Sequence, residues 1–144
     1  MQFLEKLKPL GLLVLRVALA ASFIFHGYPK LSDPARALKT FPGYGFPSYF
    51  AYISGILEVF GGGLLILGLF TRGVALLLAI EMGLVLARTK LPSAGIYAFG
   101  QYETPLLLGA MALALATTGA GVISIDAFTF ESRRKSTKKS KGKD

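Results

Sequence analysis

The chain of 144 residues contains no cysteine, no tryptophan and a single histidine. Without cysteine, the chain itself cannot form a disulfide, a thiolate zinc site or an iron–sulfur cluster. One histidine also excludes bis-histidine haem ligation within one subunit. Charged residues are scarce as well, at 17 % of the chain against about 25 % in an ordinary soluble domain.

Apolar residues are abundant instead: they make up 53 % of the chain, and the mean hydropathy is +0.56. The formal net charge is +8, but seven of the basic residues follow Ser132, so the remainder is nearly neutral. A soluble globule of this composition would expose large apolar patches. These features exclude a soluble nucleic-acid-binding enzyme and a disordered chain, and they indicate a protein whose solvent is the lipid bilayer.

Four apolar stretches are long enough to cross a bilayer core of about 30 Å, the third only just. Because they are continuous rather than alternating, they predict helices and not a β-barrel. The expected fold is all-α: a polytopic membrane four-helix bundle over residues 1–127, followed by a basic, disordered cytoplasmic tail over 128–144 that contacts anionic lipid rather than nucleic acid. The predicted spans are Leu10–Tyr28, Ser48–Phe70, Gly73–Arg88 and Thr104–Ile123.

An even number of spans brings both termini to one side of the membrane. That side would hold ten basic residues against five on the other, which predicts an inner or plasma membrane protein with both termini in the cytoplasm. In the first outer loop, a short interfacial helix is expected to begin at Pro34, capped by Ser32 or Asp33, and to end at Pro42-Gly43.

Further expectations concern turns and packing. The tight Thr71-Arg72 turn is expected to close the cytoplasmic end, and Pro105 is expected in the first turn of the fourth helix. Asp126, just past the fourth span, is expected to cap or anchor a helix near the cytoplasmic surface. Small residues on the second and fourth spans are expected to let helices approach closely, namely Gly61, Gly62, Gly68, Gly109, Ala112, Ala116 and Gly119.

Three ionisable residues fall near the middle of the predicted spans: Arg16, Glu58 and Glu81. Each would cost about 2.5–3.5 kcal/mol at the centre of a lone helix, so a shared site is expected. Arg16 is predicted to form a buried ion pair with Glu58 or with Glu81, and the sequence leaves the choice open. The pair either only locks the bundle, or accepts protons beside a bound quinone or another small ligand, or serves transport.

A second polar group is predicted at the outer end of the bundle. His26 and Glu103 lie at similar depth, which favours a hydrogen bond between them, and Lys30 follows His26 by one helical turn. We predict a ligand site between His26, Glu58 and Glu103 with Arg16 as its floor, and the same three residues are the catalytic candidates. The alternative is an interfacial histidine without chemistry. No metal site is expected, because a di-iron bundle site needs two histidines and four carboxylates.

Several strings occur in an order that resembles the DoxX family of small four-helix inner-membrane proteins. They are His26–Leu31 (HGYPKL), Glu58–Arg72 (EVFGGGLLILGLFTR), Gly100–Leu108 (GQYETPLLL), Gly119–Gly121 (GAG) and Ser124–Asp126 (SID). The resemblance covers the chain up to Ala127. It implies a link to membrane redox chemistry, through the small subunit of an archaeal thiosulfate:quinone oxidoreductase and through bacterial membrane oxidoreductase complexes.

The function expected from residues and resemblance together is that of a quinone-linked subunit of a membrane oxidoreductase system. No tightly bound cofactor is expected, so an electron-donating or complex-forming partner protein must supply the reductant to a quinone. Membrane lipids are further expected partners, a homo-oligomer is compatible with the sequence, and nucleic acid is not a partner. Two alternatives remain open: a non-enzymatic docking or stabilising subunit of a partner complex, and a small proton-coupled transporter with Glu58 or Glu81 as carrier.

Overall fold

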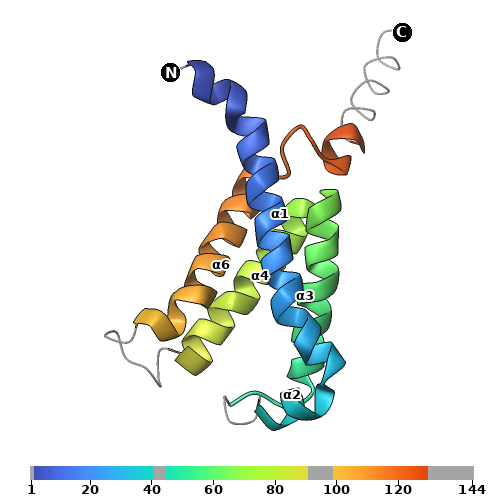
Figure 1. The fold of residues 1–144 in the computed structure, drawn as a ribbon, viewed down its shortest axis with the longest axis vertical. Coiled ribbons are helices and arrows are strands. Elements are labelled where there is room, and N and C mark those ends of the chain that lie inside the picture. The colour runs from blue at the N-terminus through green and yellow to red at the C-terminus, as the bar shows by residue number, and fades with distance from the viewer. Residues whose placement is uncertain (1, 41–44, 91–98, 130–144) are drawn as a thin grey trace, which may run out of the picture.

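The computed structural model describes residues 2–40, 45–90 and 99–129, and these are helical throughout apart from short turns, with no strand among them (Figure 1). The expected all-α class is therefore confirmed. A single helical turn over 125–129 follows the last long helix. In chain order the helices are α1 (Gln2–Ser32), α2 (Pro34–Thr40), α3 (Phe50–Leu67), α4 (Thr71–Val85), the π-helical turn η2 (Leu86–Lys90) and α6 (Phe99–Thr118).

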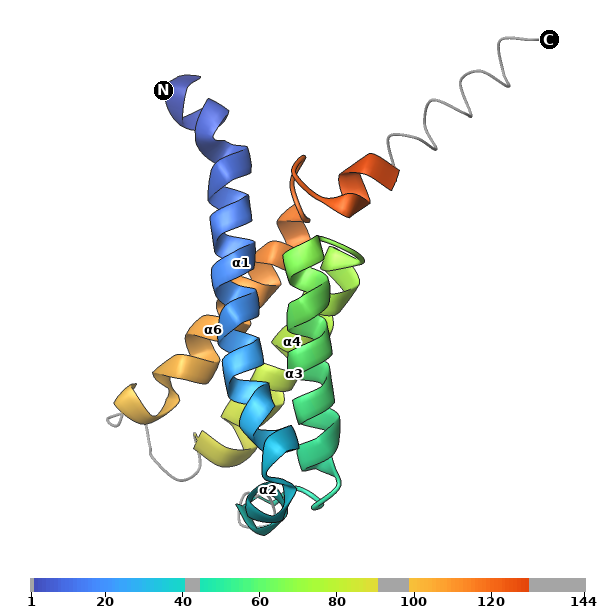
Figure 2. The ribbon, with the colours of Figure 1, turned by 45° about the vertical axis from the view of Figure 1, so that its right-hand side comes forward.

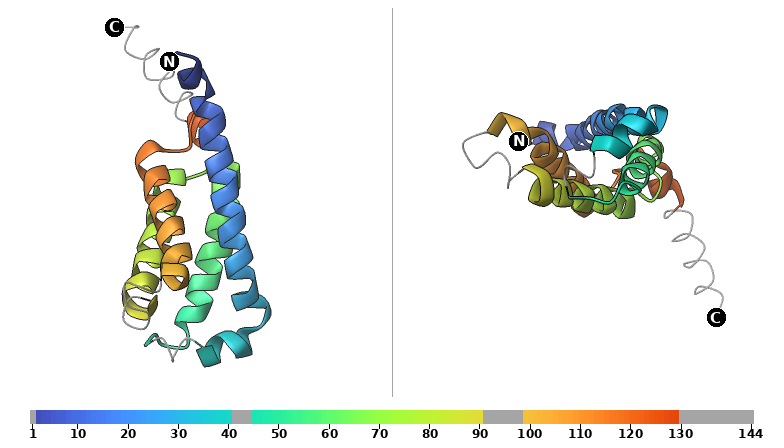
Figure 3. Two further views of the ribbon diagram at one scale, coloured as in Figure 1. Left: turned by 60° about the vertical axis from the view of Figure 1, so that its left-hand side comes forward. Right: turned by 90° about the horizontal axis from the view of Figure 1, so that it is seen from below.

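The long helices are arranged as two pairs, α1 with α3 and α4 with α6. The pairs converge at one end of the molecule, which we call the turn end because α3 turns into α4 there, and they splay apart toward the opposite α2 end (Figures 1 and 2). The start of α1 and residues 125–129 both lie at the turn end (Figure 3). This arrangement leaves the two pairs in closest contact near one end only.

The interior is apolar and contains Leu19, Phe23, Leu78 and Leu115, each at most 1 % exposed. The outer surface is apolar too: Phe25, for example, is 77 % exposed. Large exposed apolar side chains are unfavourable in water but match lipid tails. Two of the described helices, Glu5–Ser32 and Phe50–Leu67, are long and apolar enough to cross a membrane.

Small residues allow the helices to approach closely, as predicted. A Cβ atom added at Gly62 of α3 would lie 2.9 Å from the carbonyl oxygen of Ala20 on α1. One added at Gly109 of α6 would lie 3.1 Å from Cβ of Met82 on α4. Both distances are shorter than ordinary van der Waals contact, so a side chain at either position would push the helices of that pair apart.

The short helix in the first loop is confirmed as α2, which begins at Pro34. Its cap is Asp33, whose Oδ1 accepts a hydrogen bond from the backbone N–H of Arg36 at 3.2 Å. The expected end of this helix at Pro42-Gly43 lies outside the described residues. The basic tail from residue 130 onward also lies outside them, and the turn over 125–129 extends two residues past the predicted domain end at 127.

The prediction for the start of the last long helix is wrong by five residues. Helix α6 begins at Phe99 instead of Thr104, so Pro105 lies inside the helix and not in its first turn. Proline has no N–H to donate to the preceding turn, which leaves a backbone carbonyl without its usual partner. The polar residues before Pro105 extend the helix beyond the apolar stretch from which its start was predicted.

Candidate functional site

A buried ion pair joins α1 to α3 toward the α2 end of the bundle. Nζ of Lys30, in the last turn of α1, donates hydrogen bonds to Glu58 Oε2 at 2.5 Å and to Ser54 Oγ at 2.7 Å. The side chain of Lys30 is 21 % exposed and that of Glu58 only 2 %. The long lysine side chain thus brings its charge inward from the helix end and neutralises a carboxylate that could not otherwise remain charged in an apolar interior.

Two glycines bring the backbones close enough for this pair to form. A Cβ atom at Gly27 would lie 2.7 Å from Cβ of Glu58 and 3.1 Å from the carbonyl oxygen of Gly55. A Cβ atom at Gly55 would lie 3.1 Å from Cβ of Lys30. Glycine at both positions therefore sets the separation of α1 and α3 at the site.

A second carboxylate, Glu81 of α4, faces the pair from the other helix pair. It is 4 % exposed, and neither of its oxygens makes a hydrogen bond with any residue that the structure describes. Its polar neighbours are Ser54 and Glu58. Because the Ser54 oxygen already accepts from Lys30, its own proton is available to either carboxylate.

A cavity of about 310 Å³ lies between the two helix pairs at this level. Its polar wall consists of His26, Lys30 and Glu58, from α1 and α3. The opposite wall belongs to α4 and α6 and is mainly apolar, formed by Met82, Val85, Thr104, Pro105 and Leu108. The two walls of the cavity thus belong to different helix pairs. These pairs splay apart toward the α2 end (Figure 2).

His26 lies at the edge of this cavity. Its side chain is exposed, and its ring meets the ring of Phe25 edge-on, with centroids 5.9 Å apart. A positive charge on the His26 ring would attract the carboxylate of Glu58. Histidine, lysine and carboxylate therefore face one cavity, which combines hydrogen-bond donors with an acceptor.

The expected ion pair between Arg16 and Glu58 or Glu81 is wrong. Glu58 pairs with Lys30, and the Arg16 guanidinium donates to the backbone carbonyls of Ala120 at 2.8 Å and Ile66 at 3.5 Å. Arg16 is 3 % exposed and lies fourteen residues before Lys30, about 21 Å away along α1. It is therefore near the turn end and does not form the floor of the cavity.

Glu103 is also separate from the site. Its side chain is exposed, it does not line the cavity, and within residues 2–40, 45–90 and 99–129 it makes no hydrogen bond with His26. Two of the three residues predicted to form the ligand site, His26 and Glu58, are thus brought together. Lys30 and Ser54 are further members of the site. The sequence places Lys30 one helical turn beyond His26, but the predicted ligand site includes neither Lys30 nor Ser54.

The turn end is not closed, contrary to the prediction from the tight turn. A second cavity of about 580 Å³ lies there, against Phe70, Arg72 and the chain that follows α6. Asp126 has the expected capping role: its two carboxylate oxygens accept hydrogen bonds from the N–H groups of Phe70 and Thr71, each at 2.8 Å. The backbone after α6 thus folds back over the start of α4 and leaves space beside it.

No three histidine or acidic side chains gather in a way that would hold a metal ion anywhere in the described part of the chain. The acidic residues of the site are limited to Glu58 and Glu81, and the first of these is already paired with lysine.

The sequence is similar to those of two known proteins. The chain is 31 % identical over 127 residues to a Bacillus subtilis protein named "Putative oxidoreductase CatD". The alignment covers 87 % of this chain and 91 % of that protein. It is 34 % identical over 130 residues to an uncharacterized protein of Haemophilus influenzae, covering 88 % and 96 %. No solved structure matches. The DoxX family model matches residues 11–90, which include Arg16, Lys30, Glu58 and Glu81. The chain therefore belongs to the DoxX family of membrane proteins.

Proposed function

We propose that this protein is a quinone-linked subunit of a membrane oxidoreductase system and that the cavity at the α2 end receives the quinone ring. The observation that carries the proposal is the composition of that cavity: two hydrogen-bond donors, Lys30 and His26, and the carboxylate of Glu58 face an apolar wall. A quinone has two carbonyl oxygens that accept hydrogen bonds and a flat apolar ring. At about 310 Å³ the cavity is near the lower end of the range for small-molecule sites, which suits a ring with its tail outside.

The location between the helix pairs supports access from the lipid. The two walls of the cavity belong to α1 and α3 on one side and to α4 and α6 on the other. A ligand dissolved in the bilayer would reach it between the pairs, where they splay apart, without crossing the aqueous phase. The apolar residues Met82 and Leu108 would contact the ring, and an isoprenoid tail would extend along the outer surface of the bundle.

The chemistry of the site concerns protons. Reduction of a quinone to a quinol takes up two electrons and two protons. The reduced redox centre of a partner protein supplies the electrons, since this chain has no cysteine and only one histidine with which to hold such a centre. Lys30 and His26 donate hydrogen bonds to the carbonyl oxygens. His26 and Glu58 each take up one proton from water at the membrane surface and pass it to an oxygen of the reduced ring, so that two protons accompany the two electrons.

The proposed topology has four spans with both termini in the cytoplasm. Helix α4 has 15 residues, but it continues without a break into η2, and 71–90 together extend about 28–30 Å. The start of α1 and residues 125–129 lie at one end of the bundle, as an even number of spans requires (Figure 3). The sequence has ten basic residues in the segments assigned to the side of the termini and five in those assigned to the other side, which supports placing the termini in the cytoplasm of an inner or plasma membrane protein.

The experiment is mass spectrometry of a lipid extract from the purified protein, followed by titration of the delipidated protein with a short-chain quinone. We expect quinone in the extract and saturable binding. His26→Ala and Lys30→Gln should each weaken binding by about tenfold, because each variant loses a donor to a quinone carbonyl oxygen. Glu103→Gln, close to the cavity but outside it, is the matched control and should bind as the parent does.

Absence of quinone from the extract together with absence of saturable binding would contradict the proposal. Equal binding by parent, His26→Ala and Lys30→Gln would contradict the assignment of the site. In either case the protein would be better described as a non-enzymatic subunit that docks or stabilises a partner complex.

A further inference from the structure

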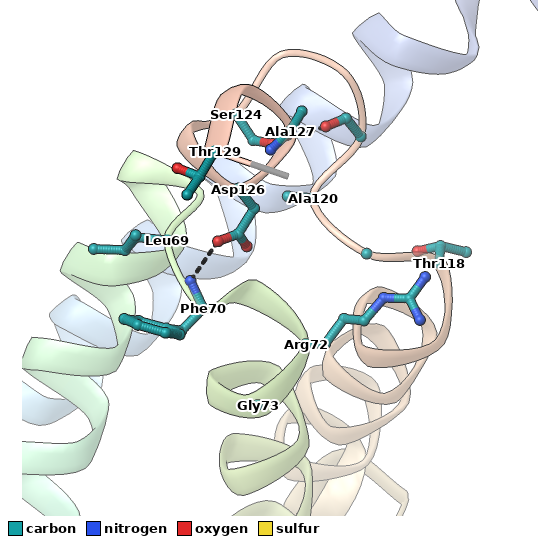
Figure 4. A pocket seen from close by; sticks show the side chains of 12 residues that line it. Leu69, Phe70, Arg72, Gly73, Thr118, Ala120, Ser124, Asp126, Ala127 and Thr129 are labelled. Atoms are coloured by element: carbon teal, nitrogen blue, oxygen red, sulfur yellow. Dashed lines mark hydrogen bonds between the residues drawn. The ribbon is translucent and has the colours of Figure 1, made fainter. Parts of the chain in front are cut away.

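The larger cavity, about 580 Å³, lies at the turn end and plays no part in the proposed quinone chemistry. Three segments surround it: the turn after α3, the first turn of α4, and the chain that folds back after α6 (Figure 4). Its lining is mostly apolar or backbone, with Leu69, Phe70, Ala120 and Ala127 among the apolar members. The polar side chains in the lining are few, so each one can be accounted for.

The hydroxyl groups in the lining already donate to backbone carbonyls. Thr118 donates to Ala114 at 2.8 Å, Ser124 to Gly121 at 2.8 Å and Thr129 to Ile125 at 2.9 Å. Both oxygens of Asp126 accept from the backbone at the start of α4. These groups are therefore satisfied within the protein.

Arg72 is different. It belongs to the first turn of α4, lines the cavity, and makes no ion pair or hydrogen bond within the described residues. In Figure 4 its guanidinium extends along the cavity toward Thr118, on the side opposite Asp126. A Cβ atom at position 119 would lie 3.0 Å from Nε of Arg72, so glycine there leaves the space that the guanidinium occupies.

The charges around the cavity leave it positive. The carboxylate of Asp126 is balanced by the amides at the N-terminus of α4, where a helix carries partial positive charge. Arg16 does not line the cavity: its guanidinium donates to the backbone carbonyls of Ala120 and Ile66, and the charge of Asp126 also acts on it. Arg72 thus contributes a positive charge with no counterion among residues 2–40, 45–90 and 99–129.

We propose that this cavity binds a phosphate group through Arg72. A guanidinium matches phosphate oxygens in a bidentate arrangement, which favours phosphate over a spherical anion. Exposed apolar side chains surround the same end, including Phe70, Val122 and Phe128, which are 71 %, 73 % and 81 % exposed. They would lie among acyl chains, so a phospholipid head group fits the site and its surroundings, and a free phosphate monoester shares the same chemistry at Arg72.

The test uses the full-length protein, purified in a phosphate-free neutral detergent and examined by native mass spectrometry. The probes are a short-chain phosphatidylglycerol, inorganic phosphate, and a diacylglycerol of the same chain length as the uncharged control. We expect phosphatidylglycerol to bind and diacylglycerol not to bind at the same concentration. Binding of inorganic phosphate with equal affinity would identify the free ion as the ligand, and its failure to bind would identify the lipid.

Variants decide whether Arg72 carries the binding. Arg72→Gln should weaken binding of the phosphate-bearing probe by about tenfold or more, while Arg88→Gln, an exposed arginine in η2 at the other end, should bind as the parent does. Arg72→Lys, which keeps the charge but loses the planar fork, should be intermediate and serves if the Gln variant does not fold. Equal binding by parent, Arg72→Gln and Arg72→Lys, or no binding of either phosphate probe, would overturn the proposal.

Discussion

The guanidinium of Arg16 lies 2.8 Å from the backbone carbonyl oxygen of Ala120, although 104 positions separate the two residues. The same guanidinium reaches the carbonyl of Ile66, near the end of α3, at 3.5 Å. Carbonyls at the C-terminal ends of helices lack intrahelical donors and carry partial negative charge. Arg16 therefore links α1 to the end of α3 and to the backbone just after α6. It holds the two helix pairs together at the turn end, where they converge.

Removal of this contact should destabilise the bundle. We expect Arg16→Ala to lower the free energy of unfolding by about 1.5–3 kcal/mol, because hydrogen bonds to a buried charged group are lost. The measurement is thermal unfolding of the purified protein in detergent, with the exposed Lys8→Ala as control. Combining Arg16→Ala with Glu58→Gln or Glu81→Gln should not restore stability. Restoration by either glutamine would show that the carboxylate, and not the carbonyls, is the partner of Arg16.

The two buried glutamates should respond differently to the same change. Glu58→Gln leaves Lys30 without its counterion and should cost about 1–3 kcal/mol, limited by the ability of lysine to turn toward the interface. Glu81→Gln should cost less, because the Glu81 oxygens make no hydrogen bond with described residues and a neutral isostere loses no partner. Unfolding midpoints of the two variants test this, and equal losses would contradict it.

A double-mutant cycle isolates the ion pair itself. If Lys30 and Glu58 are partners, Lys30→Gln combined with Glu58→Gln should be more stable than the sum of the two single losses predicts. Additive losses would mean that the two charges are stabilised by other groups.

Because α1 packs closely on α3, replacing Gly27 even with alanine should destabilise the protein. Gly27→Ala places a Cβ atom 2.7 Å from Cβ of Glu58, and we expect a loss of about 1–3 kcal/mol from the forced separation of the helices. Gly63→Ala is the matched control, since a Cβ atom there meets nothing within 4 Å and alanine favours helix. It should be neutral or stabilising by up to about 1 kcal/mol. Equal stability of the two variants would contradict this account of the pair.

The proposed topology predicts which positions can be labelled from outside the cell. Cysteine introduced at Ala35 or Ser93 should react with a membrane-impermeant thiol reagent in whole cells, whereas cysteine at Ser136 should react only after lysis. The protein has no native cysteine, so any label on it reports the introduced residue. Labelling of Ser136→Cys from outside would reverse the orientation.

The sequence by itself determined the class of structure and the residues that demand explanation. Continuous apolar stretches predict helices, because in lipid every backbone group must be satisfied within its own segment, and this local rule needs no knowledge of neighbours. The start of α2 at Pro34 was predictable from local sequence too, because proline suits the first helical position, whereas the cap was predicted only as Ser32 or Asp33. The rarity of charge inside the apolar stretches also identified Arg16, Glu58 and Glu81 as buried.

Only the tertiary structure decided which of these residues meet. The sequence predicts ion pairs from the depth of each residue in its span. Depth alone does not show that a lysine side chain can reach inward from a helix end, or that backbone carbonyls can serve as the partners of a cation. Lys30 therefore forms the ion pair with Glu58, and Gly27 and Gly55 set the separation of their helices. Arg16 instead donates to the carbonyls of Ala120 and Ile66. The pairing of buried charges depends on which helices lie side by side and at what distance, and that information arises from the packing of the whole chain.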